Sequence, residues 1–328
     1  CDTLDCEGQP VPKDRILSTY GTAAKIRAAL SYKWGRVKGV GKRLWGPSPS
    51  DASNMLGNPI MSEEVADYMP SLRRRKVAAG EISRSSRAMT QEIFLARYNY
   101  FTGLAQNSPD CWCGPTQYLQ IQCFDTLGFQ CLLRSAEILR IRMEDIEFLY
   151  DSHGKPNRAS LTLRTRKTSP YGEGIKPFII WRLPPHEAHL CPFRALCYWI
   201  HASRITSGYL FRNVNKWDQV SRLDKHMVIL QTSRRYLEIL RHTLLDIKID
   251  PTEFGTHLLR RGGVYYFYIV KGYNIQEICL WGGWSTDYNI SSVWRYIVSI
   301  MDDEKLNRVD FLNPDYSRNR CFSCGRTN

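Results

Sequence analysis

Residues 160–181 read SLTLRTRKTSPYGEGIKPFIIW, and this stretch sets the fold class of a chain whose other long segments follow helical patterns. Apolar and polar residues alternate from Ser160 to Arg164, polar residues continue to Thr168, a glycine-containing segment follows, and an apolar run ends at Trp181. Two strand-like runs separated by such a segment predict a β-hairpin. We therefore expect a mainly α-helical chain with a small β-sheet, the sheet belonging to a mixed α/β domain.

Helical signals surround this hairpin. Thr90 is expected to cap one helix, and the pattern over 117–143 predicts two closely spaced helices. Further helices are expected from Pro192, over 233–247 and from Thr256.

The N-terminal third also follows a helical pattern. Ile26, Leu30 and Trp34 recur every four residues, which predicts one apolar helix face. Ser62 is the predicted N-cap of a second helix because Glu63 and Glu64 come directly after it. Pro70 predicts a kink in that helix or a new start.

The stretch GEISRSSRAM at 80–89 has the composition of a linker. We expect an N-terminal tail at 1–11, a helical domain at 12–85, a mixed α/β domain at 86–312 and a C-terminal tail at 313–328. Since the chain does not begin with Met, a fragment or a processed product is expected.

The charge balance predicts a polyanionic partner. The 328 residues contain 45 Lys and Arg against 32 Asp and Glu, a formal net charge of +13 with a pI near 9.3. Such an excess favours nucleic acid or an anionic membrane surface, and no apolar run is long enough for a transmembrane helix. The basic residues expected to contact phosphates form an acid-free group and a compact block: Lys25, Arg27, Lys33, Arg36, Lys38, Lys42 and Arg43, then Arg73, Arg74, Arg75 and Lys76.

The cysteines do not predict a disulfide framework. Eleven Cys are spread over a large basic chain with no visible secretion signal, which favours reduced thiols. Cys321 and Cys324 have the spacing of half a zinc site, but no second pair of ligands follows them. The sequence therefore predicts neither a metal site nor a cofactor.

Several segments of the second domain carry reactive side chains. Glu137 comes three residues after Arg134, so on one helix face it would orient the guanidinium. With Thr256 as N-cap, His257 and Arg260 would share a face at i and i+3. Each of these pairs taken alone is more often structural.

Together, these residue types suit the attack on a phosphodiester. Arginines and a His stabilise the charge that develops on the phosphate. A hairpin Lys, Lys167 or else Lys176, acts as general acid toward the departing hydroxyl. A Tyr is a competent covalent nucleophile once cationic neighbours favour its ionised form.

At this point the motifs resemble those of the tyrosine site-specific recombinases, and most closely the Cre type. The segments that carry the resemblance, in order, are LLRSAEILRIRMEDI, TRKTSPYGEG, THLLRRGG, GYNIQEICLWGGW and WRYI. The N-terminal part resembles the core-binding domain of that family, a SAM-like helical bundle. The stretch NPIMSEEVADYMPSLRRRKVAAGE is similar to proteins of fungal mobile elements of the Crypton type.

The resemblance implies a role for each matched residue. Tyr296 is the implied nucleophile, because its WRYI context matches, with Tyr288 as the alternative. The other implied catalytic residues are the clamp arginine Arg134, its supporting acid Glu137, the general acid Lys167, the pair His257 and Arg260, and the buttress Trp284.

The implied activity is cutting and rejoining of DNA through a 3′-phosphotyrosine intermediate, with strand exchange through a Holliday junction. Double-stranded DNA is then the partner, with a homodimer on one site, a homotetramer in the synaptic complex and no membrane. The fungal resemblance implies a transposable element and a nuclear location. A catalytically silent architectural protein and topoisomerase-like relaxation remain as alternatives.

Overall fold

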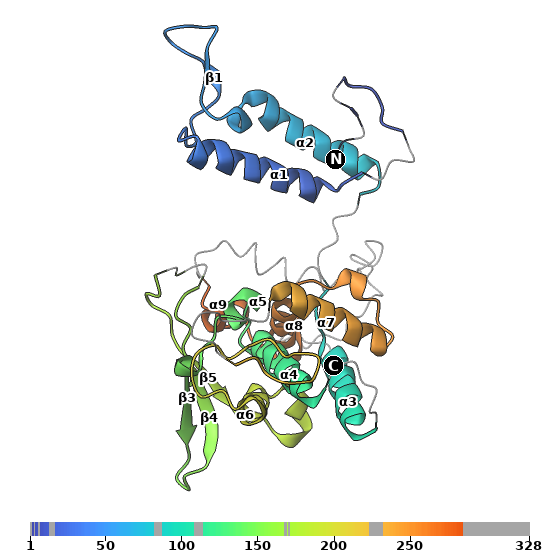
Figure 1. Cartoon of the computed structure of the whole chain (residues 1–328), viewed down its shortest axis with the longest axis vertical. Coiled ribbons are helices and arrows are strands. Elements are labelled where there is room, and N and C mark those ends of the chain that lie inside the picture. Colours follow the sequence, from blue (N-terminus) through green and yellow to red (C-terminus); the bar gives the residue numbers. More distant parts are fainter. Residues whose placement is uncertain are drawn as a thin grey trace, which may run out of the picture. The chain divides into compact units, whose positions relative to one another are not determined.

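The computed structural model describes residues 2, 4–5, 7–12, 17–81, 87–107, 114–166, 169, 171–222 and 232–284. The chain divides into two units, residues 1–84 and 85–328 (Figure 1). Each unit is described by itself.

The first unit is built on two helices. α1 (Tyr20–Tyr32) runs into a π-helical turn at Lys33–Val37, and α2 spans Glu63–Ala78. Between them lie two short antiparallel strands, β1 (Gly46–Pro47) and β2 (Met55–Leu56), and a 3₁₀ turn. The hydroxyl of Ser62 accepts a hydrogen bond from the Val65 amide at 3.3 Å, which confirms the predicted N-cap of α2.

α2 continues through Pro70 as one helix, so the new start that Pro70 allowed is wrong. The expected apolar face of α1 is also not buried, because Ile26 and Leu30 are 50% and 40% exposed. The buried Asn58 side chain donates to the Ser31 carbonyl of α1 at 3.2 Å, a polar contact that the periodicity did not predict.

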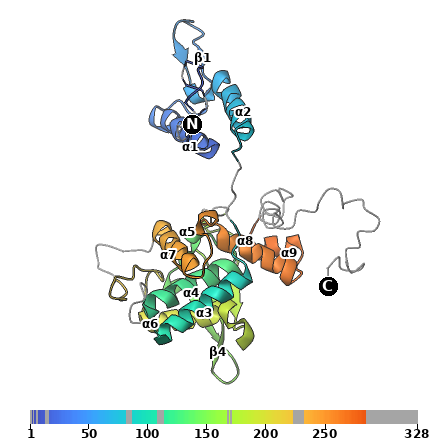
Figure 2. The same ribbon diagram turned by 90° about the vertical axis from the view of Figure 1, so that its right-hand side faces the viewer.

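Helices are the main regular structure in the described part of the second unit (Figure 2). The hydroxyl of Thr90 accepts from the Ile93 amide at 3.5 Å at the start of the first of them. In chain order, these helices are α3 (Gln91–Asn107), α4 (Pro115–Gln130), α5 (Ser135–Ile138), α6 (Pro192–Ser203), α7 (Ser233–Asp246), α8 (Leu258–Tyr265) and α9 (Ile275–Gly282).

A three-stranded antiparallel sheet of order β3-β4-β5 completes the unit. Its strands are β3 (Ile146–Tyr150), β4 (Pro156–Leu161) and β5 (Phe178–Trp181), and Leu161 pairs with Phe178 in the hairpin. The predicted hairpin is confirmed, although β4 ends at Leu161 rather than near Thr168 and β3 was not predicted. The fold class is confirmed as mainly α-helical with small antiparallel sheets.

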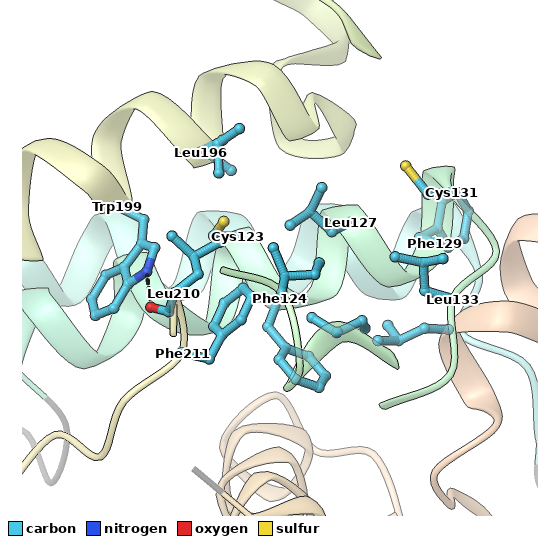
Figure 3. Close-up of a cluster of buried hydrophobic side chains, with 14 of the residues drawn as sticks. Cys123, Phe124, Leu127, Phe129, Cys131, Leu133, Leu196, Trp199, Leu210 and Phe211 are labelled. Carbon is cyan, nitrogen blue, oxygen red and sulfur yellow. Dashed lines mark hydrogen bonds between the residues drawn. The ribbon is translucent and has the colours of Figure 1, made fainter. Parts of the chain in front are cut away.

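α4 forms the centre of the second unit, since residues on all of its faces are buried. Its Phe124 stacks on Tyr236 of α7 and lies edge-on to Phe211 (Figure 3). On the α6 side, the buried Trp199 donates its indole N–H to the Leu210 carbonyl at 3.0 Å. A helix covered on every side must satisfy its polar side chains internally.

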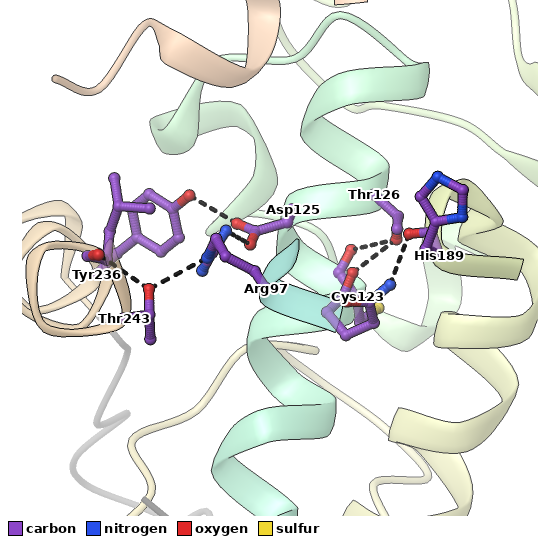
Figure 4. A network of polar contacts seen from close by, with 9 residues as sticks. Arg97, Cys123, Asp125, Thr126, His189, Tyr236 and Thr243 are labelled. Atoms are coloured by element: carbon purple, nitrogen blue, oxygen red, sulfur yellow. Dashed lines mark hydrogen bonds and ion pairs between the residues drawn. The ribbon is translucent and has the colours of Figure 1, made fainter. Parts of the chain in front are cut away.

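One such group is Asp125, which forms a buried network between three helices (Figure 4). Its carboxylate pairs with Arg97 of α3 and accepts from the Tyr236 hydroxyl at 2.6 Å. Arg97 also donates to the Thr243 hydroxyl at 3.1 Å. Burial raises the pKa of Asp125, and the Arg97 charge opposes that shift.

None of the helices in the described ranges has the length and apolar content needed to cross a membrane. The cysteines described there are free thiols: Cys123, Cys131, Cys191, Cys197 and Cys279.

Candidate active site

Arg134 and Glu137 form an ion pair at the start of α5. Arg134 is the N-cap residue in extended backbone, so it precedes the helix and does not share a face with Glu137 as the spacing had predicted. The Glu137 carboxylate accepts from the Arg134 backbone N–H at 2.8 Å and from its Nη1 at 3.0 Å. The Arg134 side chain is 27% exposed and Glu137 only 9%, so the guanidinium is fixed from below and open to a ligand.

Arg260 reaches the same carboxylate from α8. Its Nη1 lies 3.8 Å from Glu137 Oε2, and the side chain is 2% exposed. The helix begins later than expected, with His257 rather than Thr256 as its N-cap residue. The exposed side chain of His257 therefore lies at the helix entrance, while Arg260 points into the unit.

Glycine permits this approach of α8. A Cβ built on Gly263 would lie 2.0 Å from the Phe129 carbonyl oxygen, and one on Gly262 would lie 1.9 Å from that of Met89. No side chain fits at either place, so Gly263 lets α8 pack directly on the end of α4, and Gly262 lets it pack on the segment that precedes α3.

Trp284 covers Arg260. α9 ends at Gly282, and Gly283 follows with φ of +59°, the left-handed cap that turns the chain back. The Trp284 ring then lies 4.3 Å from the guanidinium carbon of Arg260, a cation–π contact. Trp281 fixes α9 to the end of α4 by donating its indole N–H to the Gln130 carbonyl at 2.7 Å.

A third arginine, not expected from the sequence, joins the cluster. Arg166 Nε lies 3.6 Å from Glu137 Oε1, and the side chain is 5% exposed. If the strand had continued with strict alternation, the Arg166 side chain would lie on the sheet face opposite to the one that carries Leu161 and Leu163. Because β4 ends at Leu161, that alternation is lost and Arg166 turns inward.

The cluster has an excess of positive charge. Three guanidinium groups lie within 4 Å of one carboxylate, so the four side chains Arg134, Glu137, Arg166 and Arg260 carry a formal charge of +2. Burial lowers the pKa of Arg166, with Glu137 opposing the shift and Arg134 adding to it. A phosphate would supply the missing negative charge and the acceptors that arginine forks favour.

The other predicted catalytic residues are not all described. Lys167, Tyr288 and Tyr296 lie outside the described residues, as do Cys321 and Cys324. Lys176, the alternative hairpin lysine, is exposed and lines a cavity of about 1080 Å³ between β5 and α9.

The predicted phosphate-contacting residues of the first unit differ in exposure. Most are exposed, including Arg73 and Arg74. Arg75 instead bonds to Asp2 at 2.6 Å, and Lys76 is buried with its Nζ 3.9 Å from Glu81. The block at 73–76 is therefore two exposed cations followed by two in ion pairs.

Comparison with known proteins gives likenesses of structure alone. Neither protein-family models nor curated proteins match the sequence. Among solved structures, XerH site-specific recombinase bound to difH substrate in a pre-cleavage complex shares 10% identity over 64% of this chain, with a TM-score of 0.42. A lambda integrase dimer bound to a COC′ core site shares 14% sequence identity over 84% of this chain, with a TM-score of 0.41. An Flpe–Holliday junction complex shares 12% identity over 89% of this chain, with a TM-score of 0.39.

This chain spans 49% of the XerH chain and 59% of each of the other two. Every TM-score is below 0.5, so these likenesses carry no functional argument. The cluster around Glu137 and the sequence motifs carry it instead.

Proposed function

We propose that the chain is a tyrosine recombinase that cuts and rejoins double-stranded DNA. The observation that carries the proposal is that Arg134 and Arg260 meet at the buried carboxylate of Glu137 and that Trp284 packs on Arg260. These residues come from segments far apart in sequence, and each belongs to a motif that the sequence alone singles out.

In the proposed reaction, Tyr296 first loses its phenol proton to solvent, which the cationic cluster favours, and the phenolate oxygen then attacks the scissile phosphorus. A 3′-phosphotyrosine bond forms, and the bond to the 5′ oxygen breaks. Arg134, Arg260 and His257 stabilise the negative charge that develops on the phosphate, and Lys167 donates a proton to the 5′ oxygen as it leaves. The covalent link conserves the bond energy, so a 5′-hydroxyl from a second duplex reverses the step.

Glu137 keeps the clamp in place. Its carboxylate binds Arg134 through both backbone and side chain and lies beside Arg260, so both guanidinium groups are oriented before DNA arrives. Trp284 shields Arg260 from water, which strengthens its interaction with a phosphate. The same proposal includes strand exchange by a tetramer through a Holliday junction. It also includes an origin in a transposable element of the Crypton type and a nuclear location.

A trapping experiment tests the chemistry. The full chain is incubated with nicked duplexes from a degenerate library, beside a Tyr296→Phe control and a Tyr288→Phe variant. We expect an SDS-stable adduct that is lost only in Tyr296→Phe, and sequencing of the trapped DNA identifies the site. Tight binding without any adduct would instead establish the architectural protein, and loss only in Tyr288→Phe would move the nucleophile.

A further inference from the structure

Arg166 has no role in the mechanism above, yet its guanidinium lies in the same cluster as Arg134 and Arg260. It approaches Glu137 from the hairpin, whereas the other two approach from α5 and α8. Any role in phosphate chemistry would make it a third guanidinium from a third part of the fold.

Its hydrogen-bonding groups point to a ligand. Nε and Nη2 of Arg166 are buried and have no hydrogen-bond partner among the residues that the structure describes. The 3.6 Å between Nε and Glu137 is an ion pair that is too long for a hydrogen bond. Buried charged donors without acceptors are costly, so an oxyanion that supplied acceptors would bind here favourably.

The guanidinium is also held in place. The Arg166 backbone exchanges two 3.0 Å hydrogen bonds with Ser169, which hold the backbone of Arg166 in place. The side chain lies over the Phe178 ring, 5.7 Å from its centre, and a Cβ on Gly283 would lie 2.3 Å from Nη1. Arg166 therefore packs against the residue before Trp284, and both border the cavity between β5 and α9.

We propose that Arg166 is a third phosphate-binding arginine, which donates to the non-bridging oxygens of the scissile phosphate together with Arg134 and Arg260. The proposal rests on the proposed function and assigns to that site a residue to which the sequence motifs gave no role. A phosphodiester gains negative charge as it is attacked, so a cluster with a formal charge of +2 favours the transition state over the ground state.

The test compares three versions of the DNA site recovered by trapping. One has a normal phosphodiester, one a methylphosphonate that lacks one charged non-bridging oxygen, and one a 5′-bridging sulfur that leaves without protonation. The variants are Arg166→Met and Arg166→Lys. The matched control is Arg164→Met on the same hairpin, because Arg164 is 55% exposed and pairs with Asp145.

We expect Arg166→Met to form the adduct about 10²–10³-fold more slowly on the phosphodiester, the usual effect of removing one oxyanion donor. On the methylphosphonate substrate, the rates of Arg166→Met and the unaltered protein should differ much less. On the bridging-sulfur substrate, the full difference in rate should persist. Arg166→Lys keeps the positive charge but loses the paired donors of the guanidinium, so its rate of adduct formation should lie between those of the unaltered protein and Arg166→Met. Arg164→Met should react like the unaltered protein.

Equal loss on all three substrates would overturn the proposal and make Arg166 structural. Recovery on the bridging sulfur alone would also overturn it, since Arg166 would then act on the leaving group. Thermal melting identifies a variant that does not fold, and Arg166→Lys then carries the comparison. If the unaltered protein forms no adduct on any substrate, the proposed function fails as well, which separates the two failures.

Discussion

Burial of single polar side chains sets the stability of the second unit. Arg97, Asp125 and Tyr236 bind one another at α4, where all three side chains are buried. Breaking one member of such a network leaves another charged and unpaired, and this costs more than the interaction contributed.

Arg97→Met tests this network. Removal of the guanidinium leaves the Asp125 carboxylate buried beside the Tyr236 hydroxyl without its counter-charge, so we expect a loss of about 3–5 kcal/mol in the free energy of unfolding. Tyr236→Phe keeps the ion pair and the ring, and should cost only about 1–2 kcal/mol. Urea unfolding measures both, and equal losses would contradict this account.

The thiol of Cys131 makes stability depend on pH. Burial raises its pKa from 9.0 to about 12, and the nearby Arg166 charge opposes the shift. Between pH 9 and 12 the unfolded chain loses this proton while the folded chain keeps it. The contribution is therefore complete below pH 9 and is lost as the pH rises toward 12.

We expect Cys131→Ala to flatten the fall of unfolding free energy above pH 9 by about 1.4 kcal/mol per pH unit. Urea unfolding at a series of pH values measures the two slopes. They should coincide below pH 8, and identical slopes at high pH would show that the thiol ionises freely in the folded chain.

At the scale of elements, the contact between α8 and α4 positions Arg260. Because Gly263 lies directly against the Phe129 carbonyl, the helix has no room for a methyl group there. The site thus depends on a backbone contact as much as on its charged side chains.

Gly263→Ala should move α8 away from α4. We expect a loss of about 1–3 kcal/mol, as for other overpacked cores, and slower adduct formation because Arg260 shifts from Glu137. Gly103→Ala in α3 is the matched control, since a Cβ there meets nothing within 4 Å and alanine favours a helix. Thermal melting compares them, and an equally stable Gly263→Ala would mean that the helices adjust at no cost.

At the scale of the whole molecule, the excess of 13 positive charges suits a nucleic-acid partner, but not every cation is available to it. Arg73 and Arg74 are exposed on α2, whereas Arg75 and Lys76 pair with acids of the same unit. Within this basic block, Arg73 and Arg74 are therefore available for phosphate binding, whereas Arg75 and Lys76 stabilise the unit itself.

Replacing Arg73 and Arg74 together with Ala should weaken DNA binding on every sequence. If each contacts one phosphate, the slope of log affinity against log salt should flatten by about 1.8. Arg75→Ala should change this slope less and lower the melting temperature instead, because it breaks the pair with Asp2. Titrations at several salt concentrations measure the slopes, and an unchanged slope in the double variant would place this face away from DNA.

Much of the local structure could be predicted from short stretches of the sequence. Ser62 starts α2, Pro192 starts α6 and the alternating stretch forms the hairpin, because each depends on residues only a few positions apart. The motifs also supplied Arg134, Glu137, Arg260 and Trp284 by residue type and order, although nothing local said that they meet.

Which cations surround Glu137, and which form ion pairs elsewhere, depends on tertiary contacts. The Arg166 side chain lies in the cluster because β4 ends at Leu161. Lys76 is not available to a phosphate because it is buried beside Glu81. Ile26 and Leu30 remain exposed although they recur on one side of α1, while the polar side chain of Asn58 binds the Ser31 carbonyl. Periodicity places side chains on one side of an element but does not specify what packs against that side, so burial and charge pairing override it.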